Sequence, residues 1–174
     1  SKQRVIINLR WSWSADLGGQ GTLPKPGTQE YNIFRDRCVA LINNTRGVWG
    51  WEILNEVNNP REHPAGYTVT PQDVRAFYSE LQSLTDARLS PGALDPFNAQ
   101  CGDPREWLKE IYQGIRASFV TAHGYIRVPQ PELVGSKDKF QDWPLTWQYL
   151  NYPGCVTELL KSLPNEYQNL PVYI

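Results

Sequence analysis

The sequence predicts an α/β fold made of parallel β/α repeats in a single domain, residues 1–174. Short β-rich runs alternate along the chain with segments whose apolar residues recur at helical spacing. Such alternation favours right-handed crossovers and a parallel sheet. No Gly-x-Gly-x-x-Gly pattern follows any expected strand, so a dinucleotide-binding domain is disfavoured. The expected strands are 5–9, 48–54, 87–94, 118–126 and 171–174.

The first half of the chain contains the two most apolar of these strands. Val-Ile-Ile-Asn-Leu at 5–9 is typical of a buried strand, and a loop rich in glycine and proline follows it at 14–28. Apolar residues at helical spacing predict a helix over 30–43, which Gly47 ends. The strand at 48–54 comes next.

In the second half, two helix starts share one pattern. Thr70-Pro71 and Asp103-Pro104 each place a capping side chain before a proline that fits the first helical turn. Helical spacing of apolar residues continues from both starts.

The remaining elements are less regular. Pro91 interrupts the strand at 87–94 and makes its end irregular. After the strand at 118–126 we expect a long loop, helical turns around 146–151 that break near Pro153, and a last helix over 156–163.

Composition excludes several classes of function. The net charge of −1 arises from interspersed acidic and basic residues, so no basic field favours nucleic acid or anionic lipid. No run approaches the roughly 20 apolar residues of a membrane span, and no signal peptide is seen. Three scattered cysteines and two histidines are too few for a disulfide framework or a zinc site. We therefore expect no metal and no other cofactor.

The apolar run 48–54 ends abruptly in Asn55-Glu56. Apolar strands normally end at turn residues, whereas here a carboxylate flanked by amides follows the strand. Parallel α/β barrels place their chemistry at the carboxyl ends of their strands, which makes Glu56 a candidate catalytic residue. The alternative is a strand-end glutamate in a solvated loop.

Trp51-Glu-Ile-Leu-Asn-Glu56 resembles the fourth-strand signature of the retaining (β/α)8 glycoside hydrolases, the clan of cellulases, mannanases, β-xylosidases and β-galactosidases. Val57 stands where the family often has Pro. His123-Gly-Tyr125 resembles the His-x-Tyr that ends the sixth strand, and 170–174 resembles the start of the seventh. The resemblance implies strands three to seven of a partial TIM barrel, because a whole barrel typically has about 250 residues.

The resemblance also implies roles for individual residues. Retaining hydrolysis uses two carboxyl groups about 5–5.5 Å apart, and Glu56 would be the general acid/base, with its pKa raised. Asn55 would bond the sugar 2-hydroxyl, which requires a bend or bulge because adjacent strand residues point to opposite faces. Tyr125 would bond the nucleophile. His123 would contact substrate, or else be a core-edge histidine bonded to backbone.

The second carboxyl group is not found in this chain. In the family it belongs to a Thr-Glu that continues the seventh strand. Glu52, four residues before Glu56 on one strand, is roughly 13 Å away. Asp95 is read as a loop cap, and Glu158 lies on a helix. We therefore expect the chain alone to be inactive in glycoside hydrolysis.

Carbohydrate is the expected partner of such a site. Trp11 and Trp13 follow the first strand at the same end and are candidates for sugar stacking, with hydrophobic cover of the glycine-rich loop as the alternative. Two other functions stay open: a carbohydrate-binding module without catalysis, and an interaction domain that self-associates through open sheet edges. The resemblance is compatible with an extracellular location.

Overall fold

The computed structural model describes residues 3–12, 21–123 and 152–174. Its strands are β1 (Ile6–Leu9), β2 (Gly50–Ile53), β3 (Leu89–Pro91), β4 (Val120–Thr121) and β5 (Val172–Tyr173). Its α-helices are α1 (Gln29–Asn44), α2 (Pro71–Leu84), α3 (Pro104–Tyr112) and α4 (Tyr152–Leu160). Two 3-10 turns, η2 (Pro60–Glu62) and η4 (Asn165–Tyr167), complete these ranges.

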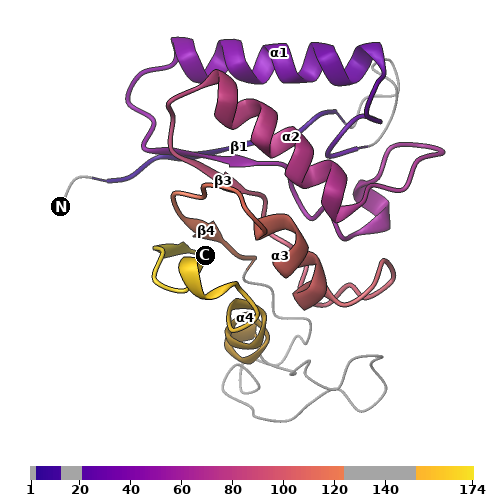
Figure 1. The fold of residues 1–174 in the computed structure, drawn as a ribbon, viewed down its shortest axis with the longest axis vertical. Helices are drawn as coiled ribbons and strands as arrows, with labels where there is room; N and C mark the ends of the chain where they lie inside the picture. Colours follow the sequence, from indigo (N-terminus) through magenta and orange to yellow (C-terminus); the bar gives the residue numbers. More distant parts are fainter. Residues whose placement is uncertain (1–2, 13–20, 124–151) are drawn as a thin grey trace.

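The strands form two small parallel sheets in chain order, so the predicted α/β fold with parallel strands is confirmed. β1, β2 and β3 make one sheet, and β4 and β5 make the other. The backbone N–H of Ser118 donates to the Leu89 carbonyl at 2.8 Å, and the Thr121 hydroxyl donates to the Pro91 carbonyl at 3.2 Å. β4 therefore lies next to β3, and the helices follow in the same order, each packed on the next (Figure 1).

The strands are shorter than the sequence predicts. β3 stops at Pro91, as expected from a proline that lacks the N–H needed to continue a ladder. The expected strand 118–126 is observed only as Val120–Thr121, and its end at 124–126 lies outside the described residues. The helical turns expected around 146–151 lie outside them too. Their break near Pro153 therefore stays a prediction; the last helix, expected over 156–163, is described as α4 from Tyr152 to Leu160.

The helix starts are the most local features of the fold and agree with prediction. The Thr70 hydroxyl accepts from the Asp73 N–H, and the Asp73 carboxylate accepts from the Thr70 N–H, which makes a full capping box before α2. Asp103 caps α3 in the simpler way, through the N–H of Arg105. Each cap is worth about 1 kcal/mol, so the start of each helix is specified within a few residues.

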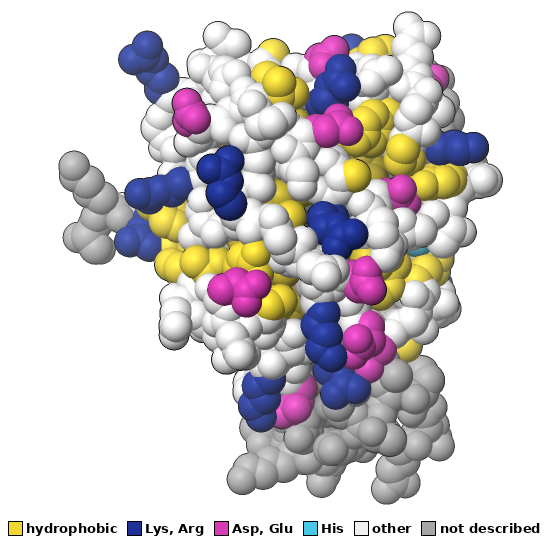
Figure 2. Space-filling model, in the orientation of Figure 1, with side chains coloured by type: hydrophobic (Ala, Val, Ile, Leu, Met, Phe, Trp, Pro, Cys, Tyr) yellow, Lys and Arg dark blue, Asp and Glu magenta, His cyan; other side chains and the backbone are white. Residues whose placement is uncertain are grey.

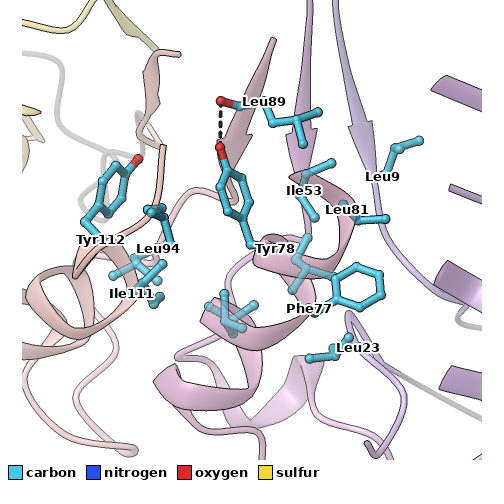
Figure 3. Close-up of a cluster of buried hydrophobic side chains, with 14 of the residues drawn as sticks. Leu9, Leu23, Ile53, Phe77, Tyr78, Leu81, Leu89, Leu94, Ile111 and Tyr112 are labelled. Carbon is cyan, nitrogen blue, oxygen red and sulfur yellow. Dashed lines mark hydrogen bonds between the residues drawn. The ribbon is translucent and has the colours of Figure 1, made fainter. Parts of the chain in front are cut away.

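The core lies where α2 and α3 pack on the first sheet (Figure 3). Phe77 and Leu81 of α2 are fully buried near Ile53 of β2. The Tyr78 hydroxyl donates to the Leu89 carbonyl at 2.9 Å and so joins α2 to β3. Burying one such aromatic side chain contributes about 1.5–3 kcal/mol, which makes this layer the main source of stability.

The surface carries charges of both signs. On the face shown in Figure 2, lysine and arginine side chains lie among aspartate and glutamate side chains, without a broad area of one sign. Among the described helices, none is both long and apolar enough to cross a membrane.

Candidate active site

The chain turns sharply where β2 ends. Leu54 and Glu56 both have left-handed backbone, with φ of 76° and 42°, although neither is glycine. Such conformations cost of order 1–3 kcal/mol each and persist only where neighbours hold them. The bend that the sequence requires at this strand end is therefore present, on both sides of Asn55.

Hydrogen bonds from three other segments hold this bend. The Leu54 N–H donates to the Leu9 carbonyl at 2.7 Å, which continues the β1–β2 pairing. The Asn55 N–H donates to the Thr22 hydroxyl at 2.7 Å. The Glu56 N–H donates to the Ala93 carbonyl at 2.8 Å. Each backbone donor of the bend therefore has an acceptor, which offsets the strain.

Gly92, just after β3, makes room for the bend. A Cβ at this position would lie 2.3 Å from the Leu54 carbonyl oxygen and 2.8 Å from that of Ile53. Both atoms are backbone, so no side-chain rotation relieves the contact. Glycine is required here by close approach of two main chains.

Glu56 is buried at the end of β2, with 8% of its surface exposed. Its Oε1 lies 2.8 Å from Nδ1 of His123, which follows β4. Its Oε2 accepts from the Asn59 side-chain amide at 3.2 Å. The fold therefore brings together two residues that the resemblance singled out, from strand ends 67 positions apart. The solvated-loop alternative for Glu56 is wrong, because this carboxyl is buried.

The contact with Glu56 controls the charge of His123. Burial lowers the pKa of the imidazole, but the hydrogen bond and negative charge of Glu56 outweigh burial and leave the pKa raised. Glu52 and Asp95 act in the same direction. The pair therefore favours a protonated imidazole that donates to the Glu56 carboxylate.

Glu62 is a site residue that sequence reasoning missed. It ends the turn η2 in a polar stretch of the sequence, yet only 7% of its surface is exposed. Burial raises the pKa of its carboxyl, and the negative charge of Glu56 raises it further. Asn59-Pro60 before it repeats the cap-plus-proline pattern, which was a usable signal for the turn.

The loops after β2 and β3 are fastened to each other by Asn58, which is fully buried. Its side-chain amide donates to the carbonyls of Asp95 and Asn98 at 2.8 and 3.1 Å, and its Oδ1 accepts from the Asp95 N–H at 2.9 Å. The Asp95 carboxylate accepts from the Phe97 N–H, so the expected loop-cap role of Asp95 is confirmed.

The other predicted residues fall into two groups. Tyr125 and Trp13 lie outside the described residues. The Trp11 ring packs edge-on against Phe34 of α1 at 5.5 Å between centroids, and its two expected roles, sugar stacking and cover of the glycine-rich loop, stay predictions. Glu52 of β2 accepts from the Ala93 N–H at 2.9 Å.

Within the described ranges, no group of three or more His, Cys, Asp or Glu side chains is arranged to hold a metal ion. Comparison of the chain with models of protein families, with curated proteins and with solved structures found nothing similar.

Proposed function

We propose that the chain is a glycoside hydrolase-like domain of the retaining type, a partial (β/α)8 barrel that acts on β-linked polysaccharide or oligosaccharide. Glu56 is its general acid/base. The observation that carries the proposal is the 2.8 Å contact between Glu56 and His123. These are the residues that resemble the family's fourth and sixth strand ends, and the contact joins them at the carboxyl ends of β2 and β4, where parallel barrels place their chemistry.

The surroundings of Glu56 suit both halves of acid/base catalysis. As an acid, Glu56 gives a proton to the leaving oxygen, which by the resemblance requires its carboxyl to be protonated when substrate binds. As a base, the Glu56 carboxylate accepts a proton from water, and a hydrogen bond from His123 stabilises that carboxylate beforehand. The roles of Asn55 and Tyr125 toward the sugar and the nucleophile follow from the resemblance alone.

A direct test is hydrolysis of soluble cellulose, mannan and xylan derivatives by the chain, measured as reducing ends. By the resemblance the nucleophile follows β5, so we expect no turnover by these 174 residues alone. A hydrolysis rate that disappears in Glu56→Ala would mean that the chain holds its own second carboxylate. A rate that is unchanged in Glu56→Ala would remove Glu56 from the proposed role.

Binding measurements separate the enzyme from a carbohydrate-binding module. Titration of cellohexaose, mannohexaose and xylohexaose, followed by tryptophan fluorescence, should detect binding of at least one sugar. In an acid/base site, Glu56→Gln should change the affinity because this carboxyl contacts the glycosidic oxygen. Unchanged binding in Glu56→Gln favours the module.

Self-association is a second candidate, supported by apolar side chains on the outer strands. Val172 of β5 is 40% exposed, and Val5, next to β1, is 51% exposed. Unpaired strand edges can add a strand from another chain. Sedimentation equilibrium tests this: a concentration-dependent mass supports edge pairing, and a constant monomer mass excludes it.

A further inference from the structure

Asn59 follows Glu56 by three residues and is joined to it by two hydrogen bonds. The Asn59 backbone N–H donates to the Glu56 carbonyl at 2.8 Å, which closes a turn of the chain. The Asn59 side-chain Nδ2 donates to the Glu56 carboxyl oxygen Oε2 at 3.2 Å. His123 contacts the other carboxyl oxygen, Oε1, so two side chains from different segments hold the same carboxyl group.

The turn η2 fixes which end of the Asn59 amide faces Glu56. Asn59 caps this turn, and its Oδ1 accepts from the Arg61 N–H at 3.1 Å. Its carbonyl accepts from the Glu62 N–H at 2.9 Å, and Pro60 after it favours the extended backbone that Asn59 adopts. The amide oxygen is thus used by the cap, and the NH2 group points to the carboxylate. An amide turned the other way would lose both side-chain hydrogen bonds.

The contact distinguishes the two protonation states of Glu56. A hydrogen bond donated to a carboxylate favours its ionised form. An amide N–H donates and does not accept, so it cannot take a hydrogen bond from a proton carried on Oε2. Asn59 therefore favours the form of Glu56 that acts as a base and opposes the form that acts as an acid.

The other charged groups of the site act on Glu56 independently of Asn59. The Glu62 carboxyl is buried, and its Oε2 has almost no accessible surface and makes no hydrogen bond with any described residue. Glu62 and Glu56 repel each other through their negative charges. The further groups that face this set of side chains are His123, Arg10, Glu52 and Asp95. All of them remain when Asn59 is replaced, so a change at Glu56 in an Asn59 variant reports on the amide.

We propose that Asn59 is a positioning residue for the proposed reaction: its amide holds the Glu56 carboxyl and stabilises the carboxylate that takes a proton from water. The inference rests on the proposed function, because it assigns a role toward the general acid/base of that site. The same bond opposes protonation of Glu56, so Asn59 also helps to set the pH range in which Glu56 acts as an acid.

The test replaces the amide and keeps the cap of η2. Asn59→Ser retains a capping oxygen but is too short to reach the Glu56 carboxyl, whereas Asn59→Asp retains the cap and places a second carboxylate beside Glu56. Asn98→Ser is the matched control, because the Asn98 Oδ1 also accepts from the N–H of the second residue after it, at 3.1 Å, but in the loop after β3. Thermal melts show which variants are folded.

The carboxyl ¹³C resonance of Glu56, assigned by its absence from Glu56→Gln, is followed with pH in each protein. We expect the pKa of Glu56 to be about one pH unit higher in Asn59→Ser than in the wild type, from the loss of one hydrogen bond to a charged group. Asn59→Asp should raise it further, because two adjacent carboxylates resist ionising together. Asn98→Ser should leave it unchanged.

One measurement needs no variant of Asn59. In the wild type, the side-chain amide protons of Asn59, assigned by triple-resonance NMR, should shift with the same midpoint as the Glu56 carboxyl. The reason is that a proton added to Glu56 weakens the bond from Nδ2. This result tests the contact even if both Asn59 variants fail to fold.

Three outcomes overturn the inference: an unchanged pKa of Glu56 in folded Asn59→Ser, an equal rise in Asn98→Ser, or wild-type Asn59 amide protons that do not respond when Glu56 titrates. These measurements use no sugar, so each of these outcomes leaves the proposed function standing. The proposed function is tested separately by the sugar titrations. If no hexasaccharide binds the wild type, the role of Asn59 in a reaction is removed, even where the pKa of Glu56 responds as expected.

Discussion

The two ends of β2 are built in opposite ways. At its amino end, the Trp49 ring contacts Phe119 and Tyr173, with centroids 5.2 and 5.0 Å apart. The guanidinium groups of Arg4 and Arg88 lie over the same ring at 4.8 and 5.1 Å. At its carboxyl end, the backbone is left-handed, and the carboxyl groups of Glu56 and Glu62 are buried there, with the pKa of Glu62 raised.

This difference indicates that the amino end of β2 stabilises the fold, whereas the carboxyl end lowers its stability. Aromatic and cation–π contacts at the amino end are favourable without strain. The carboxyl end combines backbone strain with an unpaired buried oxygen, and such conflicts gather at functional sites. Substitutions at the amino end should therefore change stability alone, whereas those at the carboxyl end should change the site.

Gly92→Ala should have the largest effect, because it forces a Cβ against the main chain of the Leu54 bend. We expect a loss of about 3 kcal/mol in the free energy of unfolding, measured in urea. Gly47→Ala is the control: its φ is 82° but no atom lies within 4 Å of the added Cβ, so it should cost only about 1–2 kcal/mol of left-handed strain. Equal losses in both would show that the close approach is unimportant.

Trp49→Ala should come next, with a loss of about 2 kcal/mol from its aromatic and cation–π contacts. The pKa of His123, followed by NMR of the imidazole, should not change. A shift of the His123 pKa in this variant would contradict the separation of the two ends, because it would show that the amino end of β2 is coupled to the site.

Glu56→Gln should have a smaller effect on stability and a specific one on pH dependence. The raised pKa of His123 contributes stability that is complete below about pH 6.5 and is lost as the pH rises through the raised value. Without the Glu56 carboxylate the pKa of His123 should fall, so less stability should be lost on the alkaline side. NMR titration and melts on both sides of neutrality measure this, with Glu158→Gln on α4 as the unaffected control.

Glu62→Gln should have the smallest effect, a gain in stability at neutral pH. The pKa of Glu62 is raised, so its contribution is complete below about pH 4.3, the ordinary glutamate value, and is lost as the pH rises. Glutamine does not ionise and avoids that loss. Melting temperatures should favour the variant at neutral pH and converge with the wild type in acid; a difference that stays constant with pH would contradict this.

Local features of the fold were predictable from the sequence. The caps at Thr70 and Asp103 depend on residues three or fewer positions away, so their pattern is visible in the chain. Glu56 could be identified because it interrupts an apolar run. The need for a bend at Asn55 followed from the alternation of side chains along a strand.

The rest of the site depends on contacts between distant segments. Thr22 meets Asn55 across 33 positions, and Glu62 lies in a polar stretch where a buried glutamate looks like a solvated one. The requirement for glycine at position 92 comes from the path of another strand. The pairing of β4 likewise joins distant residues, Val120 with Val172 of β5, which no local pattern records.

Asn58 has a consequence for altering what the site recognises. The Asn58 side-chain amide both donates to and accepts from the backbone of Asp95, so the loop after β2 and the loop after β3 are held by the same side chain. Replacing only one of these loops would leave the buried hydrogen-bonding groups of the other without partners. A change of specificity by loop exchange must therefore replace both loops together.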